Sequence, residues 1–145
     1  MSRLFAVGLD NPKTNVNVGA VIRAVGVYGG QMVAVSGHRY SAAATDTMKG
    51  HQRIPVLHNL DDLHAVVPFD SVPVAVELID DAISLVDYVH PKNAFYVFGA
   101  EDNTLGQRVL SWCRDVVFVP TRHCMNLAAT VNVVLYDRMA KELRR

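Results

Sequence analysis

The stretch AFYVFGAE, residues 94–101, joins the most strand-like segment of the chain to a polar loop. Its first five residues are apolar or aromatic, which favours a strand that is covered on both faces. Gly99 then allows the backbone to approach a ligand closely. Similar apolar runs precede and follow this stretch, and the expected strands are 4–9, 32–35, 54–57, 72–76, 94–98 and 116–119. Pro55 cannot donate to a ladder, so the strand at 54–57 is expected at a sheet edge.

Helix-like segments alternate with these strands. Either Asn15 or Asn17 is expected to cap the first helix, which continues to Tyr28 and is stopped by Gly29-Gly30. The remaining helices are expected at 60–66, 82–88, 105–113 and 127–143. This alternation predicts an α/β fold, with a mainly parallel sheet and helices on both faces. Ligands of such sheets bind at the carboxyl ends of the strands.

Composition supports one globular domain over residues 1–145. The chain is 50% hydrophobic with a formal net charge of +0, which argues against intrinsic disorder. No apolar run is long enough to span a bilayer, and no signal peptide is recognised, so a cytoplasmic protein is expected. Cys113 and Cys124 form neither a disulfide framework nor a standard metal-ligand pair, so we expect no metal.

Three loops carry the polar residues that chemistry would need. Residues 11–19 are rich in asparagine and lead into the first helix, where Arg23 stands among apolar neighbours and should therefore be paired or placed at a ligand. Residues 98–106 follow a strand but contain neither GxGxxG nor a Walker lysine, which argues against a dinucleotide or triphosphate site. Residues 119–127 lead into the last helix, and Cys124 with its neighbour His123 is an improbable nucleophile–base pair.

A local basic segment interrupts the neutral chain. Residues 37–58 contain a single acid, Asp46, and the basic or potentially basic residues are His38, Arg39, Lys49, His51, Arg53 and His58. A solvated surface is one interpretation of this segment. Contact with the phosphates of a nucleic acid is the other, because basic side chains release condensed counterions there.

Taken together, the three loops resemble the SpoU-type (TrmH-like) branch of the SPOUT RNA methyltransferases over nearly the whole chain. The stretch Asn17-x-Gly19-x-x-x-Arg23 resembles the family's first motif, and Phe98-Gly99-x-Glu101 resembles its second motif. The third resembles Asn126-Leu127 with the apolar residues that follow. The small size is similar to that of minimal members that methylate tRNA ribose.

The resemblance implies a trefoil knot near the C-terminus, S-adenosylmethionine as cofactor, an RNA substrate and a homodimer. It implies that Arg23 acts beside the cofactor of the partner subunit, supported by Asn17, Glu101 and Asn126. The implied cofactor contacts are Glu77, Leu78, Gly99, Val119, Cys124 and Leu127. The expected RNA contacts are Arg39, Lys49, Arg53, Arg122 and His123.

The expected reaction is transfer of a methyl group to a ribose 2′-hydroxyl, which needs alignment of the reactants and stabilisation of the developing oxyanion. A guanidinium loses its proton only above pH ~12, so Arg23 suits a clamp better than a general base. His123 is the second candidate proton acceptor.

Three alternatives remain open on the sequence. The first is 2′-O-methylation of rRNA. The second is a non-catalytic RNA-binding or assembly module, which is favoured by departures from the family pattern: Thr104 replaces a usual glycine, and Cys124 and Ala128 replace usual serines. The third is an unknotted nucleotide-binding domain.

The expected dimer uses apolar faces of the first and last helices. The candidates are Val21, Val25, Val133, Tyr136 and Met139.

Overall fold

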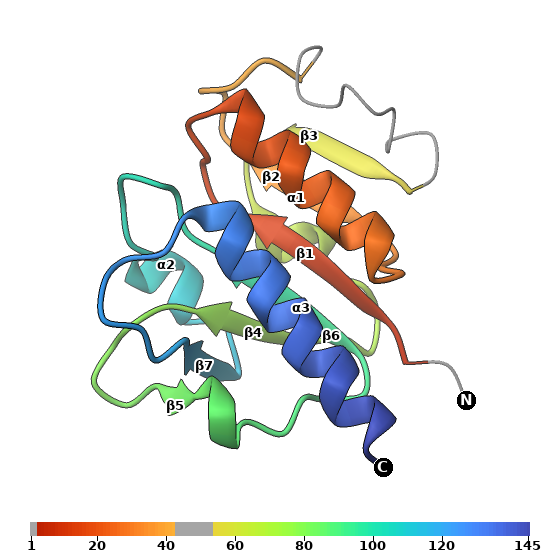
Figure 1. Cartoon of the computed structure of the whole chain (residues 1–145). Helices are drawn as coiled ribbons and strands as arrows, with labels where there is room; N and C mark the ends of the chain where they lie inside the picture. The colour runs from red at the N-terminus through yellow and green to blue at the C-terminus, as the bar shows by residue number, and fades with distance from the viewer. Residues whose placement is uncertain (1–2, 43–53) are drawn as a thin grey trace.

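The structure is a computed structural model that describes residues 3–42 and 54–145. Within these residues, one sheet has the strand order β3-β2-β1-β6-β4-β7-β5, and every strand pair is parallel (Figure 1). The strands are β1 (Phe5–Leu9), β2 (Val33–Ser36), β3 (Val56–Leu60), β4 (Val72–Val76), β5 (Ile83–Ser84), β6 (Ala94–Phe98) and β7 (Asp115–Phe118). The predicted α/β fold with a mainly parallel sheet is confirmed, and β3 occupies the predicted edge.

Helices cover both faces of the sheet. The long helices α1 (Asn15–Val27) and α3 (Leu127–Leu143) lie side by side on one face. The short helix α2 (Gln107–Leu110) and the 3-10 turn η3 (Leu63–Val66) cover the other face, and a second 3-10 turn, η4 (Leu85–Asp87), follows β5. This division follows from the strands, because successive side chains point to opposite faces.

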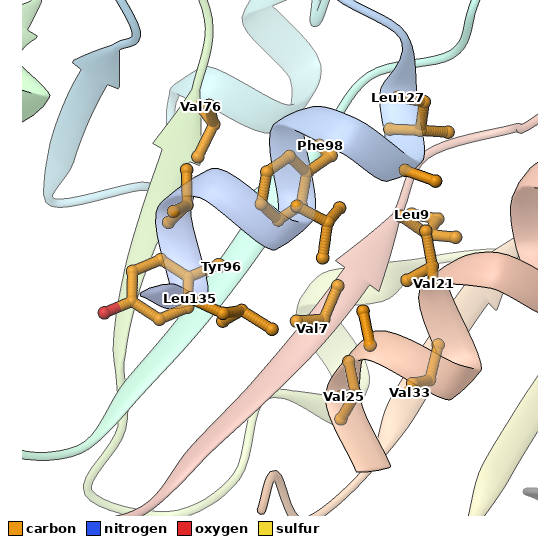
Figure 2. Close-up of a cluster of buried hydrophobic side chains, with 14 of the residues drawn as sticks. Val7, Leu9, Val21, Val25, Val33, Val76, Tyr96, Phe98, Leu127 and Leu135 are labelled. Carbon is orange, nitrogen blue, oxygen red and sulfur yellow. The ribbon is translucent and has the colours of Figure 1, made fainter. Parts of the chain in front are cut away.

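The larger core lies under α1 and α3. In Figure 2, Val7, Leu9, Tyr96 and Phe98 from the central strands face side chains of both helices. The helix residues labelled there are Val21, Val25, Leu127 and Leu135. The intervening strand residues, Ala6, Phe95 and Val97, pack instead against Leu63, Leu105 and Val109. All five residues of β1 and of β6 are buried, which explains why both segments are apolar at every position.

Three predicted helices are wrong in part. The helix expected over 60–66 shortens to the 3-10 turn η3, because Leu60 is the last residue of β3. Residues 82–88 form β5 and η4, because the backbone of Ile83 and Ser84 pairs with β7 and the Ser84 hydroxyl then accepts from the Val86 N–H at 3.4 Å. The helix expected over 105–113 shortens to α2, since the chain must turn back to begin β7 at Asp115.

The predicted cap of α1 is also corrected. Neither Asn15 nor Asn17 is the N-cap, because Thr14 has the extended backbone of that position and its Oγ1 accepts from the Asn17 N–H at 3.3 Å. The Asn17 side chain is therefore available for a contact elsewhere.

A buried arginine fixes the C-terminal half of α3 to the amino end of the sheet. Arg138 is 2% exposed, and its guanidinium donates to the carbonyls of Pro91 (2.8 Å) and Lys92 (2.7 Å) and to the Tyr96 hydroxyl (3.0 Å). It also lies 3.4 Å from the Glu142 carboxylate one turn later. One side chain thus satisfies polar groups from three parts of the chain.

We expect Arg138→Leu to lower the free energy of unfolding by about 3 kcal/mol, because it leaves buried carbonyls without their donor and removes a charged partner of the Glu142 carboxylate. Chemical denaturation of the purified protein measures the difference. Arg144→Leu is the matched control at an exposed position of the same chain end and should change the free energy by less than about 0.5 kcal/mol. Equal effects of the two substitutions would contradict this account of the anchor.

Candidate functional site

A cleft of about 940 Å³ opens at the carboxyl ends of β4, β6 and β7. Its walls are the loops after these three strands, together with the start of α3. Every residue predicted to contact a cofactor lines this one cleft: Glu77, Leu78, Gly99, Val119, Cys124 and Leu127. Three segments that are distant in sequence, the loops after β4, β6 and β7, therefore converge at one edge of the sheet. The first motif, around Asn17 and Arg23, does not line the cleft.

Gly99 shapes the floor of the cleft. A Cβ at this position would lie 3.2 Å from the Asn103 carbonyl oxygen and 3.4 Å from the Leu105 side chain, which is tighter than most real contacts. The absence of a side chain lets the loop fold back over β6. The cleft therefore retains backbone surface that a ligand can approach.

Glu77 holds two walls of the cleft together. Its Oε2 accepts from the Leu105 N–H at 2.8 Å and its Oε1 from the Leu78 N–H at 3.0 Å. The carboxylate thus ties the loop after β4 to the loop after β6. This role in shaping the wall was not predicted from the sequence.

Glu101 gathers the first loop onto the second. Its Oε1 accepts from the Lys13 N–H at 2.9 Å, and its Oε2 accepts from the Thr14 N–H (3.0 Å), the Thr14 hydroxyl (2.9 Å) and the Asn17 side-chain amide (3.0 Å). Burial by itself would raise the pKa of Glu101, but these hydrogen bonds lower it to about 2. Glu101 is therefore an ionised, fully engaged acceptor rather than a general base.

Asn17 and Asn126 extend this arrangement to the third loop. The Asn126 side-chain amide donates to Asn17 Oδ1 at 3.0 Å, while Asn126 Oδ1 caps α3 by accepting from the Ala129 N–H at 3.1 Å. The hydrogen-bonded chain Glu101–Asn17–Asn126, the motif bridge, thus connects all three predicted motifs.

Arg23, like the other predicted site residues Asn17, Asn126 and Arg39, does not line the cleft. It is exposed on α1. It makes no hydrogen bond or ion pair with the described residues. Its guanidinium is open to solvent, and the partner that the sequence argument requires is not found among the described residues.

The predicted RNA contacts divide into three groups. Arg122 and His123 are exposed and line the cleft. Arg39 forms a two-point ion pair with Asp102, with both distances 2.9 Å, and donates to the Asn11 carbonyl at 2.6 Å. This pairing raises the pKa of Arg39 and lowers that of Asp102. Lys49 and Arg53 lie outside the described residues.

The structure shows the location and exposure of each residue that departs from the family pattern. Cys124 and Thr104 are exposed and line the cleft, whereas Ala128 is buried in the core. No hydrogen bond joins Cys124 to His123 in the part of the chain that the structure describes. Burial raises the pKa of the other thiol, Cys113, to about 12, which leaves it unreactive.

Sequence reasoning missed several residues that build the site. The Thr14 cap and the Arg39–Asp102 pair are the main examples. Thr14 is of a residue type favoured at an N-cap and directly precedes the expected helix, and Asp102 directly follows Glu101. Nothing in the sequence places Asp102 beside Arg39, which lies 63 positions away.

The chain belongs to the SpoU rRNA Methylase family, whose model matches residues 4–136. This match confirms the resemblance carried by the three motifs. None of the curated proteins matches the sequence.

Solved structures share the fold at low sequence identity. The SpoU methyltransferase AviRb from Streptomyces viridochromogenes, in complex with AdoMet, has a TM-score of 0.83 at 17% identity. The similarity covers 100% of this chain but only 63% of AviRb. A structure that concerns 2-OH methylation of C/U34 on tRNA has a TM-score of 0.83 at 17% identity and is covered over 99% of both chains. The A. aeolicus TrmH/SpoU tRNA modifying enzyme has a TM-score of 0.82 at 15% identity, over 99% of this chain and 77% of that enzyme.

Two classes of feature are not found in residues 3–42 and 54–145. No three His, Cys, Asp or Glu side chains gather as a metal site would require. No helix there has the length and apolar character needed to cross a membrane.

We expect Glu101→Gln to lower the free energy of unfolding at pH 7 by about 1 kcal/mol, a small value because the site is partly exposed. The folded-state pKa is depressed, so the stabilisation is present above the ordinary glutamate pKa and is lost as the pH falls towards about 2. Denaturation at a series of pH values should therefore show the wild-type protein and the variant converging in acid. Asp80→Asn, at an exposed position, is the control. A difference between the wild-type protein and the Glu101→Gln variant that persists at low pH would contradict the role of the charge.

Proposed function

We propose that this chain is an RNA methyltransferase that transfers a methyl group from S-adenosylmethionine to a ribose 2′-hydroxyl of tRNA, in the cytoplasm. The observation that carries the proposal is the motif bridge, which joins the three family motifs beside one cleft. Family membership supports RNA methylation. The structure that concerns 2-OH methylation on tRNA aligns with this chain over 99% of both chains, which favours tRNA as the substrate.

The cleft suits the cofactor in size and in chemistry. Its volume lies in the range of sites for small molecules and cofactors. Gly99 leaves backbone accessible, Leu78 and Leu127 supply apolar surface, and Val119 and Cys124 complete the wall. When bound, the cofactor supplies an electrophilic methyl group on a sulfonium.

Arg23 of one subunit acts at the cleft of its partner in this proposal. Within one chain Arg23 is exposed and away from the residues that line the cleft. A permanently charged guanidinium is suited to hold a phosphate and to stabilise an oxyanion. The motif bridge positions the loops, and His123 at the cleft is the candidate acceptor of the hydroxyl proton.

The dimer proposal needs one correction. Val21 and Val25 are each 0% exposed because they fill the core of the monomer, so they are excluded as interface residues. Val133, Tyr136 and Met139 on α3 are exposed as predicted. The exposed apolar residues on α1 are instead Val16 and Val27, which lie on the same side as Arg23. Since α1 and α3 pack together, an isologous pairing of these faces would bury them and carry Arg23 to the other subunit.

The C-terminal trefoil knot is part of the same proposal. The loops at 99–104 and 119–126, which form two walls of the cleft, are the segments that such a knot would use. The likeness of the fold to solved SpoU structures supports it.

We expect Arg23→Ala to reduce the rate of methyl transfer at least about 100-fold, because a group that stabilises the transition state contributes on this scale. The affinity for S-adenosylmethionine should change little, since Arg23 does not line the cleft of its own chain. Transfer of labelled methyl to tRNA and calorimetric titration of the cofactor measure the two quantities. Full activity of the variant would remove Arg23 from the reaction.

Mixing two inactive variants tests whether Arg23 acts across subunits. Gly99→Val should disrupt the loop that forms a wall of the cofactor cleft, because a side chain there meets the Asn103 carbonyl and Leu105, and Arg23→Ala should remove the clamp. A mixed dimer would contain one complete site, so random exchange of subunits should restore about a quarter of the wild-type activity. Each variant alone, taken through the same exchange procedure, is the control. No recovery after confirmed subunit exchange would show that Arg23 does not act in trans.

Ribosomal RNA is the second candidate substrate, and the description of the family favours it. Mapping ribose methylation in cells that lack the protein distinguishes the two RNAs. Loss of a site in tRNA supports the first proposal, and loss of one in rRNA supports the second. An unchanged methylation map, with RNA binding by the purified protein, would instead favour a non-catalytic module.

Affinity for tRNA should fall steeply as salt is added, because the expected contacts of Arg122, Lys49 and Arg53 are with phosphates. We expect Arg122→Ala to reduce the slope of log affinity against log salt by about 1. Arg144→Ala is the matched control with the same loss of charge. A flat salt response of the wild-type protein would contradict phosphate contact.

A further inference from the structure

A second cavity, the polar pocket, lies at the carboxyl ends of β1, β2 and β3. Its volume is about 460 Å³. The loop after β1 contributes Asp10 and Asn11. The end of β2 and the loop after it contribute Ser36, Gly37 and His38, and the end of β3 and the loop after it contribute Leu60 and Asp61. The loop after β6 and Arg108 of α2 close the remaining side. None of the predicted catalytic, cofactor or RNA residues lines this pocket.

The topology of the sheet favours a ligand at this place. The loop after β1 leads to α1 on one face, whereas the loop after the adjacent β6 leads to α2 on the opposite face. Neighbouring loops that diverge in this way leave a crevice, and α/β proteins bind ligands in it. The candidate cofactor cleft lies on the other side of β6, so it leaves this crevice free for a different ligand.

Asp10 offers a preorganised acceptor in the polar pocket. Its side chain is 17% exposed, and its Oδ1 accepts from the Ser36 hydroxyl at 3.1 Å and lies 3.6 Å from the Arg108 guanidinium. Its Oδ2 makes no hydrogen bond with the residues that the structure describes. The Ser36 hydroxyl oxygen also accepts from the Asn11 N–H at 3.0 Å, and the Leu9 carbonyl at 3.4 Å is a second, longer acceptor for its proton.

The charges of the polar pocket point to a neutral polar ring rather than a lone phosphate. Asp10 and Asp61 supply acceptors, Arg108 and His38 supply donors, and Leu60 adds an apolar surface. Each carboxylate lies near a basic side chain, Asp10 at 3.6 Å from Arg108 and Asp61 at 3.9 Å from His38, so the pocket offers no excess of positive charge for a lone phosphate. A nucleobase has an apolar face and an edge that carries both donors and acceptors, and an Asp carboxylate accepts from its amino group.

Asn103 and Thr104 form a wall shared by the polar pocket and the cofactor cleft. The Arg39–Asp102 pair joins the two sides, because Asp102 lines the cleft and Arg39 binds the carbonyl of Asn11 in the polar pocket. A ligand in the polar pocket therefore lies one loop away from the reacting centre.

We propose that the polar pocket binds a single unpaired nucleobase of the RNA substrate and selects one with an amino group. The proposal rests on the proposed function, since it makes the polar pocket a specificity site of the same reaction. Recognition of splayed-out bases through their polar edges is the usual way in which proteins distinguish RNA sequences.

Titration of the ¹⁵N-labelled protein with guanosine, cytidine or uridine 5′-monophosphate tests the proposal by NMR. Amide shifts should concentrate at Asp10–Asn11, Gly37–His38 and Asn103–Gly106. Guanosine or cytidine monophosphate should bind more tightly than uridine monophosphate, which has no amino group. Asp10→Asn should weaken the tighter complex roughly tenfold, as loss of a base-specific acceptor does.

Arg108→Ala provides a second variant that keeps the fold, because this side chain is 72% exposed and, among residues 3–42 and 54–145, contacts only Asp10 as a polar partner. It should also weaken binding, whereas the matched control Arg114→Ala, outside the polar pocket, should not. Shifts confined to the cofactor cleft, equal affinity for all three nucleotides, or wild-type binding by both variants would overturn the proposal. Binding without any methyl transfer would contradict only the proposed function. Methyl transfer with an empty polar pocket would contradict only this inference.

Discussion

The carboxylate of Glu101 is the interaction on which the site depends. Four donors from residues 13–17 converge on its two oxygens, and hydrogen bonding to the ionised form lowers its pKa to about 2. Without this acceptor, the backbone N–H groups at the start of α1 would lack partners inside the protein. Glu101 also orients Asn17, which then receives Asn126 and fixes the start of α3.

Two acidic side chains on one loop therefore organise the carboxyl end of the sheet. Glu101 holds the loop after β1, and its neighbour Asp102 holds Arg39 in the loop after β2. Glu77 adds the loop after β4 by accepting from the Leu105 N–H. The loop that carries Glu101 and Asp102 lies between the candidate cofactor cleft and the polar pocket, and its Asn103 and Thr104 line both. In the proposed function, the cofactor and the RNA base would lie on different sides of this loop.

The opposite end of the molecule supplies rigidity rather than chemistry. Arg138 and its carbonyl partners fix α3 against the amino end of the sheet, and the Tyr96 hydroxyl connects Arg138 with His90. Because α3 begins at the cleft and ends in this buried network, its position is determined at both ends. The same packing leaves one side of α1 and α3 apolar and exposed, where the proposed dimer would form.

Short stretches of sequence predict many of the strands and the family of this protein. Apolar runs such as 94–98 predict strands buried on both faces, because the periodicity of a strand is a local pattern. The three motifs predict the family, and the second and third predict two loops of the cleft. Only the tertiary structure decided that residues 82–88 are not a helix, that Val21 and Val25 are core, and that Arg39 meets Asp102. Such outcomes depend on which strand lies beside which, and on which face of a helix meets the sheet. No local pattern specifies that arrangement, since it results from burying all the apolar surfaces together.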